Sequence, residues 1–124
     1  FFYFIDKLFK HLYFDKALKK SSKGDAITWT NLGATYLKIS ERDKALECFD
    51  KAIQLTPNWA NAWNLRGVLY FRESDYDKAL ENFEKAFEFN SGDTSILNNL
   101  NVICFFIENA VSYIMLLRFA VYSI

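Results

Sequence analysis

The chain has 124 residues, of which 52% are hydrophobic and 24% charged, so it can bury a core and does not have a disordered composition. Fifteen basic and fifteen acidic residues give a net charge of zero, and we therefore expect no nucleic-acid partner. Two cysteines and one histidine are too few for a disulfide framework, and we expect no metal, no cofactor and no catalytic residue.

The predicted elements are all helices. Apolar residues recur at spacings of three and four along the chain, which is the period of an amphipathic α-helix. Short polar segments separate these stretches, and Pro57 ends one of them because proline cannot continue a helix. The spacing predicts about seven helices, over residues 2–20, 26–39, 42–55, 60–73, 76–89, 94–107 and 110–123.

An internal repeat organises the middle of the chain. Residues 26–59 align with residues 60–93 at an offset of 34, and thirteen of the 34 pairs are identical. The longest identical run pairs Asp43 to Glu47 with Asp77 to Glu81. A fixed period of this length is typical of a solenoid built from stacked helical hairpins.

The repeated residues resemble the tetratricopeptide repeat (TPR), a helix–turn–helix unit. All eight signature positions are filled in the first unit, by Trp29, Leu32, Gly33, Tyr36, Ala45, Phe49, Ala52 and Pro57. The second unit departs at Arg66, where leucine is usual, and at Ser91, where proline is usual. The resemblance implies one all-α domain, a right-handed α-solenoid of antiparallel helix pairs. Its parts are a half repeat with an N-terminal helix in 1–25, repeats 26–59 and 60–93, and a divergent third repeat or C-terminal helix pair in 94–124.

The resemblance also implies a noncatalytic protein-interaction module. Proteins of this family hold a peptide or helix of a partner on the concave surface formed by the first helix of each pair. Among the side chains opposite the packing stripe, the predicted peptide-binding residues are Thr30, Lys38, Asn61, Asn64, Val68, Phe71, Arg72, Asn98 and Phe105. We expect the amides to bind a peptide backbone, the two cations an acidic group, and the phenylalanines an apolar side chain.

Both ends of the chain are unusually apolar for a repeat array, whose terminal helices normally have a polar outer face. One interpretation is a homodimer or self-assembling scaffold whose terminal helices cover each other, through Phe2, Ile5, Phe9, Leu12, Ile114, Leu117 and Val121. A second is that the chain is a fragment of a longer array. A third is membrane contact, which a turn at Glu108-Asn109 disfavours because it would divide the apolar stretch into two short helices. No secretory signal is recognisable, so we expect a cytoplasmic protein.

Overall fold

The computed structural model describes residues 3–5, 7–8 and 25–122, and that part of the chain contains helices and no strand. Residues 3–5 and 7–8 are helical, whereas most of the expected helix over residues 2–20 lies outside the described residues. The five helices that follow are α2 (Ala26–Lys38), α3 (Arg42–Leu55), α4 (Ala60–Arg72), α5 (Tyr76–Phe89) and α6 (Thr94–Tyr122). The ends of α2 to α5 agree with the sequence prediction to within one residue.

The helix ends follow from local side-chain chemistry. Asp25 precedes α2, and its carboxylate accepts a hydrogen bond from the backbone N–H of Thr28 at 2.7 Å. This bond, together with a second from the Thr28 hydroxyl, holds the pKa of Asp25 below its ordinary value. A lowered folded-state pKa means that the cap stabilises α2 above the ordinary pKa of an aspartate and is lost as the pH falls through the lowered value. Asp75 caps α5 in the same way.

The turn inside each hairpin requires an unusual backbone conformation. Ser40 and Ser74, which occupy equivalent positions of the two repeats, both have a φ of 61°. This left-handed conformation reverses the chain between α2 and α3, and again between α4 and α5. Serine is a short polar residue, for which the conformation is less costly than for a long or branched side chain.

Glycine permits each hairpin to pack closely. A Cβ atom built on Gly33 would lie 2.6 Å from Cε1 of Phe49, and one built on Gly67 would lie 2.6 Å from Cε1 of Phe83. Phe49 is 0% exposed and Phe83 2% exposed, so neither ring has free space to enter. Buried alanines at equivalent positions of α3 and α5 extend these contacts.

Substituting alanine at Gly67 tests this packing. The overpacking is expected to cost about 1–3 kcal/mol of unfolding free energy, which outweighs the roughly 1 kcal/mol that alanine gains over glycine in helix propensity. Urea unfolding followed by circular dichroism measures the loss. Gly92→Ala is the matched control, because the nearest atom to a Cβ built there is Asn90 Oδ1 at 3.9 Å. An equal effect of both substitutions would contradict the packing argument.

The C-terminal region departs from the prediction of two helices over 94–107 and 110–123. The structure has one continuous helix, α6, of 29 residues, and no turn at Glu108-Asn109. The repeat offset places Glu108 where Ser40 and Ser74 form the earlier turns. No glycine or proline interrupts residues 94–124, and the Asn109 side chain donates to the Phe105 carbonyl at 2.8 Å, within the helix. The polar residues Glu108 and Asn109 therefore do not end the helix, which continues through them.

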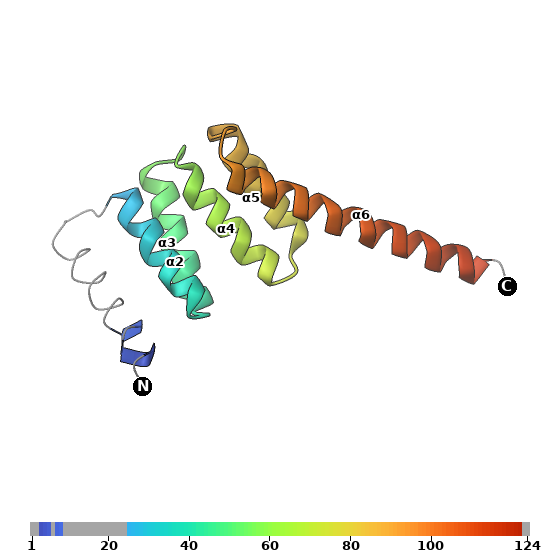
Figure 1. Cartoon of the computed structure of the whole chain (residues 1–124), viewed down its shortest axis with the longest axis horizontal. Coiled ribbons are helices and arrows are strands. Elements are labelled where there is room, and N and C mark those ends of the chain that lie inside the picture. The colour runs from blue at the N-terminus through green and yellow to red at the C-terminus, as the bar shows by residue number, and fades with distance from the viewer. Residues whose placement is uncertain (1–2, 6, 9–24, 123–124) are drawn as a thin grey trace.

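The helices form a two-layer array, as expected for an α-solenoid. The hairpins α2/α3 and α4/α5 stack, and α6 packs on α5 and α4 (Figure 1). The first half of α6 is anchored by Ile96 and Ile103, both 0% exposed. From Glu108 to Tyr122 every residue is exposed, and this projecting segment extends away from the array (Figure 1).

Candidate functional site

The expected concave surface is formed by α2, α4 and α6, the first helix of each repeat. The central helix α4 contacts both α2 and α6. Of the nine predicted binding residues, five are exposed on these helices: Lys38, Asn61, Arg72, Asn98 and Phe105. Val68 and Phe71 are half-buried, and Thr30 and Asn64 are buried. The structure therefore leaves most of the predicted surface open, while two of its members lie in the interior.

Thr30 is 1% exposed and connects helices within the array. Its hydroxyl donates to the Ala26 carbonyl at 2.6 Å and accepts from the indole Nε1 of Trp59 at 3.1 Å. Trp59 directly precedes α4, so this bond joins the first repeat to the start of the second. Because both hydroxyl bonds are made inside the protein, Thr30 is not available to a partner.

Asn64 is 5% exposed and is likewise used internally. Its Oδ1 atom accepts a hydrogen bond from Nδ2 of Asn99 at 2.9 Å, which joins α4 to α6. Asn99 is not among the predicted binding residues, because the repeat offset pairs Asn64 with Asn98 rather than with Asn99. The amides that remain exposed on this surface are Asn61 and Asn98.

Arg72 ties α4 to the end of α2. Its Nη1 atom donates to the Leu37 carbonyl at 3.0 Å, in the last turn of α2, and the same carbonyl accepts from the Ser40 backbone N–H at 3.2 Å. The two residues also line a hollow of about 150 Å³ between the ends of α2 and α4, together with Leu69. Arg72 thus combines a structural bond with an exposed position beside this hollow.

Aromatic rings gather where α4 and α5 meet α6. The ring centroid of Phe71 lies 5.6 Å from that of Tyr76 and 5.3 Å from that of Phe106. Phe105 lies 6.2 Å from Phe106 and is 64% exposed. Phe71, Tyr76, Phe105 and Phe106 are called the aromatic patch below. Phe106, which the sequence analysis left out of the predicted binding residues, supports Phe105 from the side.

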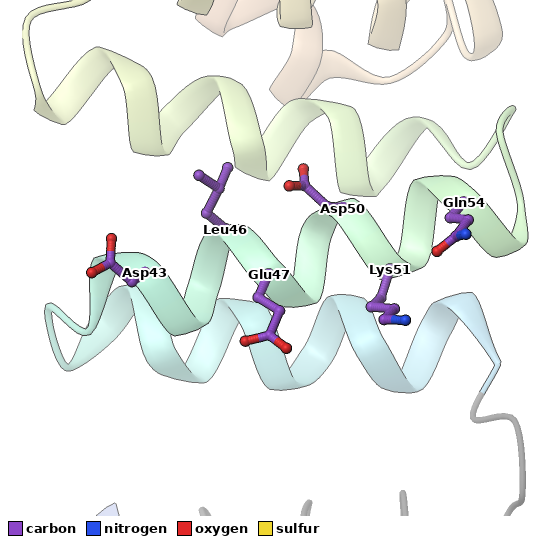
Figure 2. Close-up of a pocket in the computed structure, with 6 residues that line it drawn as sticks. All are labelled: Asp43, Leu46, Glu47, Asp50, Lys51 and Gln54. Atoms are coloured by element: carbon purple, nitrogen blue, oxygen red, sulfur yellow. The ribbon is translucent and has the colours of Figure 1, made fainter.

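A shallow depression of about 320 Å³ lies on α3, outside the predicted surface. Figure 2 shows the side chains that line it, with Leu46 and Asp50 directed toward α4. Asp50 accepts a hydrogen bond from Arg66 Nη1 at 2.8 Å, so this carboxylate is part of the contact between α3 and α4. The remaining charged side chains are exposed, as on an ordinary solvated helix face.

Arg66, which replaces the usual leucine, is hydrogen-bonded to side chains of both α3 and α5. Its Nε atom donates to Asn82 Oδ1 at 2.7 Å, and its guanidinium lies 4.7 Å from the ring centroid of Trp63. Asn82 is 4% exposed and also donates to the Lys78 carbonyl at 2.8 Å. The residues at the equivalent positions of the first repeat are Leu32 and Cys48. One repeat therefore carries leucine and cysteine where the other carries an arginine hydrogen-bonded to an asparagine.

The predicted self-association residues are only partly described. Ile114, Leu117 and Val121 are exposed on the projecting segment of α6, and Ile5 is 45% exposed. Phe2, Phe9 and Leu12 lie outside the described residues. One described helix, α6, has the length and apolar composition of a membrane span, with a mean hydropathy of 1.8 over a window that is 6% buried. Self-association through these residues stays a prediction.

The described residues 3–5, 7–8 and 25–122 contain no group of three His, Cys, Asp or Glu side chains that could hold a metal ion. The exposed side chains of the expected concave surface are amides, cations and aromatic rings. Such groups bind other molecules by hydrogen bonds, charge and apolar contact.

Comparison with known proteins identifies the repeats. The tetratricopeptide repeat family model matches residues 26–58 and 60–93, more than half of the chain. The chain belongs to the tetratricopeptide repeat family. TPR domains generally serve protein–protein interaction, so membership of the family supports the broad expectation of an interaction module.

Two solved structures show the same fold. The crystal structure of YrrB, a TPR protein with an unusual peptide-binding site, matches with a TM-score of 0.72 and 26% identity, over 77% of this chain and 48% of that one. The TPR domain of Sgt2 from Aspergillus fumigatus matches with a TM-score of 0.73 and 28% identity, over 80% of this chain and 66% of that one. The chain thus spans about half of YrrB and just under two thirds of the Sgt2 domain. No curated protein sequence matches it.

Proposed function

We propose that this TPR protein binds a peptide or helix of a partner protein on the concave surface of α2, α4 and α6. The observation that carries the proposal is the exposure of Lys38, Asn61, Asn98 and Phe105 on these three helices. The packing stripe of the same helices is largely buried, with Leu32 2% and Tyr36 6% exposed. The exposed set is therefore not needed for the fold and is available to a ligand.

The chemistry of this surface suits a polypeptide. An amide side chain offers a donor and an acceptor, as a peptide backbone does, so Asn61 and Asn98 can each bond one peptide group. The ammonium group of Lys38 attracts a carboxylate of the ligand. The ring of Phe105 can contact an apolar side chain of the ligand, and Phe106 of the aromatic patch packs against that ring.

The hollow beside Arg72 supplies a second anchoring point. Leu37 and Leu69 form an apolar wall, and the Arg72 guanidinium lies at its edge. A ligand with an apolar residue and a nearby carboxylate fits this combination. The similarity to YrrB supports the proposal, because YrrB is a TPR protein with an unusual peptide-binding site.

Replacing Phe105 by serine is expected to weaken binding of a peptide selected against the full chain by at least tenfold. Truncating a central aromatic anchor typically removes about 2 kcal/mol or more of binding free energy. Fluorescence anisotropy with the labelled peptide measures the affinity. Phe119→Ser is the matched control, since Phe119 lies on the same helix, is 76% exposed and belongs to the projecting segment.

Equal affinity of the wild type and the Phe105→Ser chain would contradict a concave binding site. Circular dichroism melting of both variants shows whether a loss of binding follows from unfolding. Because both phenylalanines are largely solvent-exposed, neither substitution is expected to change stability by more than about 0.5 kcal/mol.

Self-association is the second candidate function. It is favoured by the exposure of Ile114, Leu117 and Val121, which are 56%, 50% and 70% exposed on the projecting segment. Soluble monomers rarely expose a contiguous apolar area of more than a few hundred Å². Association of two chains would remove part of this area from water.

A further inference from the structure

The net charge of zero conceals two oppositely charged parts of the chain. Residues 1–24 contain six lysines and two aspartates, a formal charge of +4. The remaining residues, 25–124, contain nine basic and thirteen acidic residues, a formal charge of −4. The basic part is also strongly apolar, with Tyr3, Phe4 and Leu8 being 75%, 68% and 53% exposed.

An apolar depression with an acidic edge lies between α6 and the start of α5. Its volume is about 470 Å³, and Ile107, Val111 and Ile114 of α6 form its apolar side. The other side is the turn between α4 and α5 together with the start of α5, and it contributes Glu73, Asp75 and Asp77. Glu73 pairs with Arg42, and Asp75 caps α5 and lies 3.6 Å from Lys78 Nζ. The depression therefore presents an apolar surface beside the exposed carboxylate of Asp77.

We propose that the basic, apolar N-terminal segment of a second copy of this chain docks in this depression. The inference rests on the self-association candidate and names its two surfaces. Apolar side chains of residues 1–24 cover Val111 and Ile114, and lysines of the same segment face the carboxylate of Asp77 at the start of α5. Opposite charges steer the two surfaces together and set their register, while the apolar contact supplies most of the affinity.

A second copy is the occupant that the geometry favours. α2, which follows the N-terminal segment, and α6 lie at opposite ends of the array (Figure 1). The start of α2 therefore lies at the end of the array away from α6. In a two-fold dimer, each copy can insert its N-terminal segment into the depression of the other copy, so that both depressions are occupied.

A lipid bilayer is the competing occupant of the projecting segment. The carboxylates of Asp75 and Asp77 lie beside Val111 and Ile114, so insertion of this end would bring them against the lipid headgroups. Arg118 would then lie within the hydrocarbon, where a charged side chain costs about 2.5–3.5 kcal/mol on insertion scales. Charge thus favours the basic protein segment over the bilayer.

Light scattering after size exclusion tests the proposal on the full chain. The wild type is expected at twice the 14.5 kDa mass of one chain, and high salt is expected to weaken the association by screening the charges. Asp77→Lys and Ile114→Asp are each expected to weaken association at least tenfold. Glu84→Lys is the matched control, because Glu84 is an exposed carboxylate of the same helix outside the depression.

Mixing two variants with exchanged charges tests the proposed contact more specifically than the single substitutions do. A chain carrying Lys16→Glu, Lys19→Glu and Lys20→Glu is expected to associate poorly with itself, as is the Asp77→Lys chain. An equimolar mixture of the two is expected to form a dimer, because each segment then meets a residue 77 of opposite charge. Circular dichroism establishes that each variant is folded.

Four outcomes would overturn the proposal. They are a monomeric wild type, a dimer that Asp77→Lys and Ile114→Asp leave intact, a mixture that does not associate, and a monomer that co-sediments with phosphatidylcholine vesicles through α6. None of them bears on peptide binding, which the Phe105→Ser comparison measures separately.

Discussion

Truncating Phe49 to alanine is expected to lower the free energy of unfolding by about 3–5 kcal/mol, the usual range for a fully buried phenylalanine. The side chain is 0% exposed, and its ring occupies the space that Gly33 leaves open between α2 and α3. Because a repeat contacts only its neighbours, no distant part of the array can close the resulting cavity. Urea unfolding followed by circular dichroism measures the effect.

The control for this substitution is Phe87→Ala on α5. Phe87 is 37% exposed, so its truncation leaves no closed cavity and is expected to cost about 1 kcal/mol at most. A similar loss for both phenylalanines would mean that the glycine–phenylalanine contact is not the centre of the hairpin. A loss of unfolding free energy below about 1 kcal/mol for Phe49→Ala would lead to the same conclusion.

The pair Arg66 and Asn82 is expected to behave as a coupled unit. Arg66→Leu leaves Asn82 Oδ1, in a side chain that is 4% exposed, without its donor. Asn82→Cys removes the acceptor of the Arg66 Nε atom, whose side chain is 19% exposed. Each single change is expected to cost about 1–3 kcal/mol, because an interior polar group loses its partner.

The double variant Arg66→Leu/Asn82→Cys is expected to lie within about 1 kcal/mol of the wild type, or to exceed it. It reproduces the Leu32 and Cys48 pair of the first repeat, whose side chains are 2% and 3% exposed. A double-mutant cycle from urea unfolding gives the coupling energy. Strictly additive losses would show that the two residues act independently and that the second repeat cannot accept the leucine and cysteine pair.

The helical array can be predicted well from the sequence, because the same residue pattern occurs in both repeats and the helix ends are marked by nearby residues. The stripe that contains Gly33 and Phe49 recurs at the same offset in Gly67 and Phe83, so each copy supports the interpretation of the other. Asp25 and Pro57 mark helix ends through chemistry that needs no tertiary context. The family model then matches the same two units.

The expected turn at Glu108-Asn109 was wrong for a physical reason. The earlier turns depend on Ser40 and Ser74, which adopt a φ of 61°. Glu108 stands at the equivalent place, and a long side chain adopts that conformation less readily. Repeat register and polarity predicted a reversal there, whereas the local residues favour helix.

The candidate site could be predicted only in part. Helical spacing places Thr30 and Asn64 on the same face as Lys38 and Asn61. Spacing shows which face of a helix a side chain lies on, but it does not show whether a neighbouring helix buries that side chain. Whether a neighbouring side chain covers a position depends on tertiary contacts, here with Trp59 and Asn99. Those contacts join residues 29 and 35 positions apart, which no local pattern reveals.

The most direct test of the concave surface is a nuclear magnetic resonance titration of the full chain with a selected peptide. The expected result is that backbone amide shifts change along α2, α4 and α6, with the largest changes near Lys38, Asn61, Asn98 and Phe105. Changes confined to α3 and α5, or to the projecting segment of α6, would contradict the account.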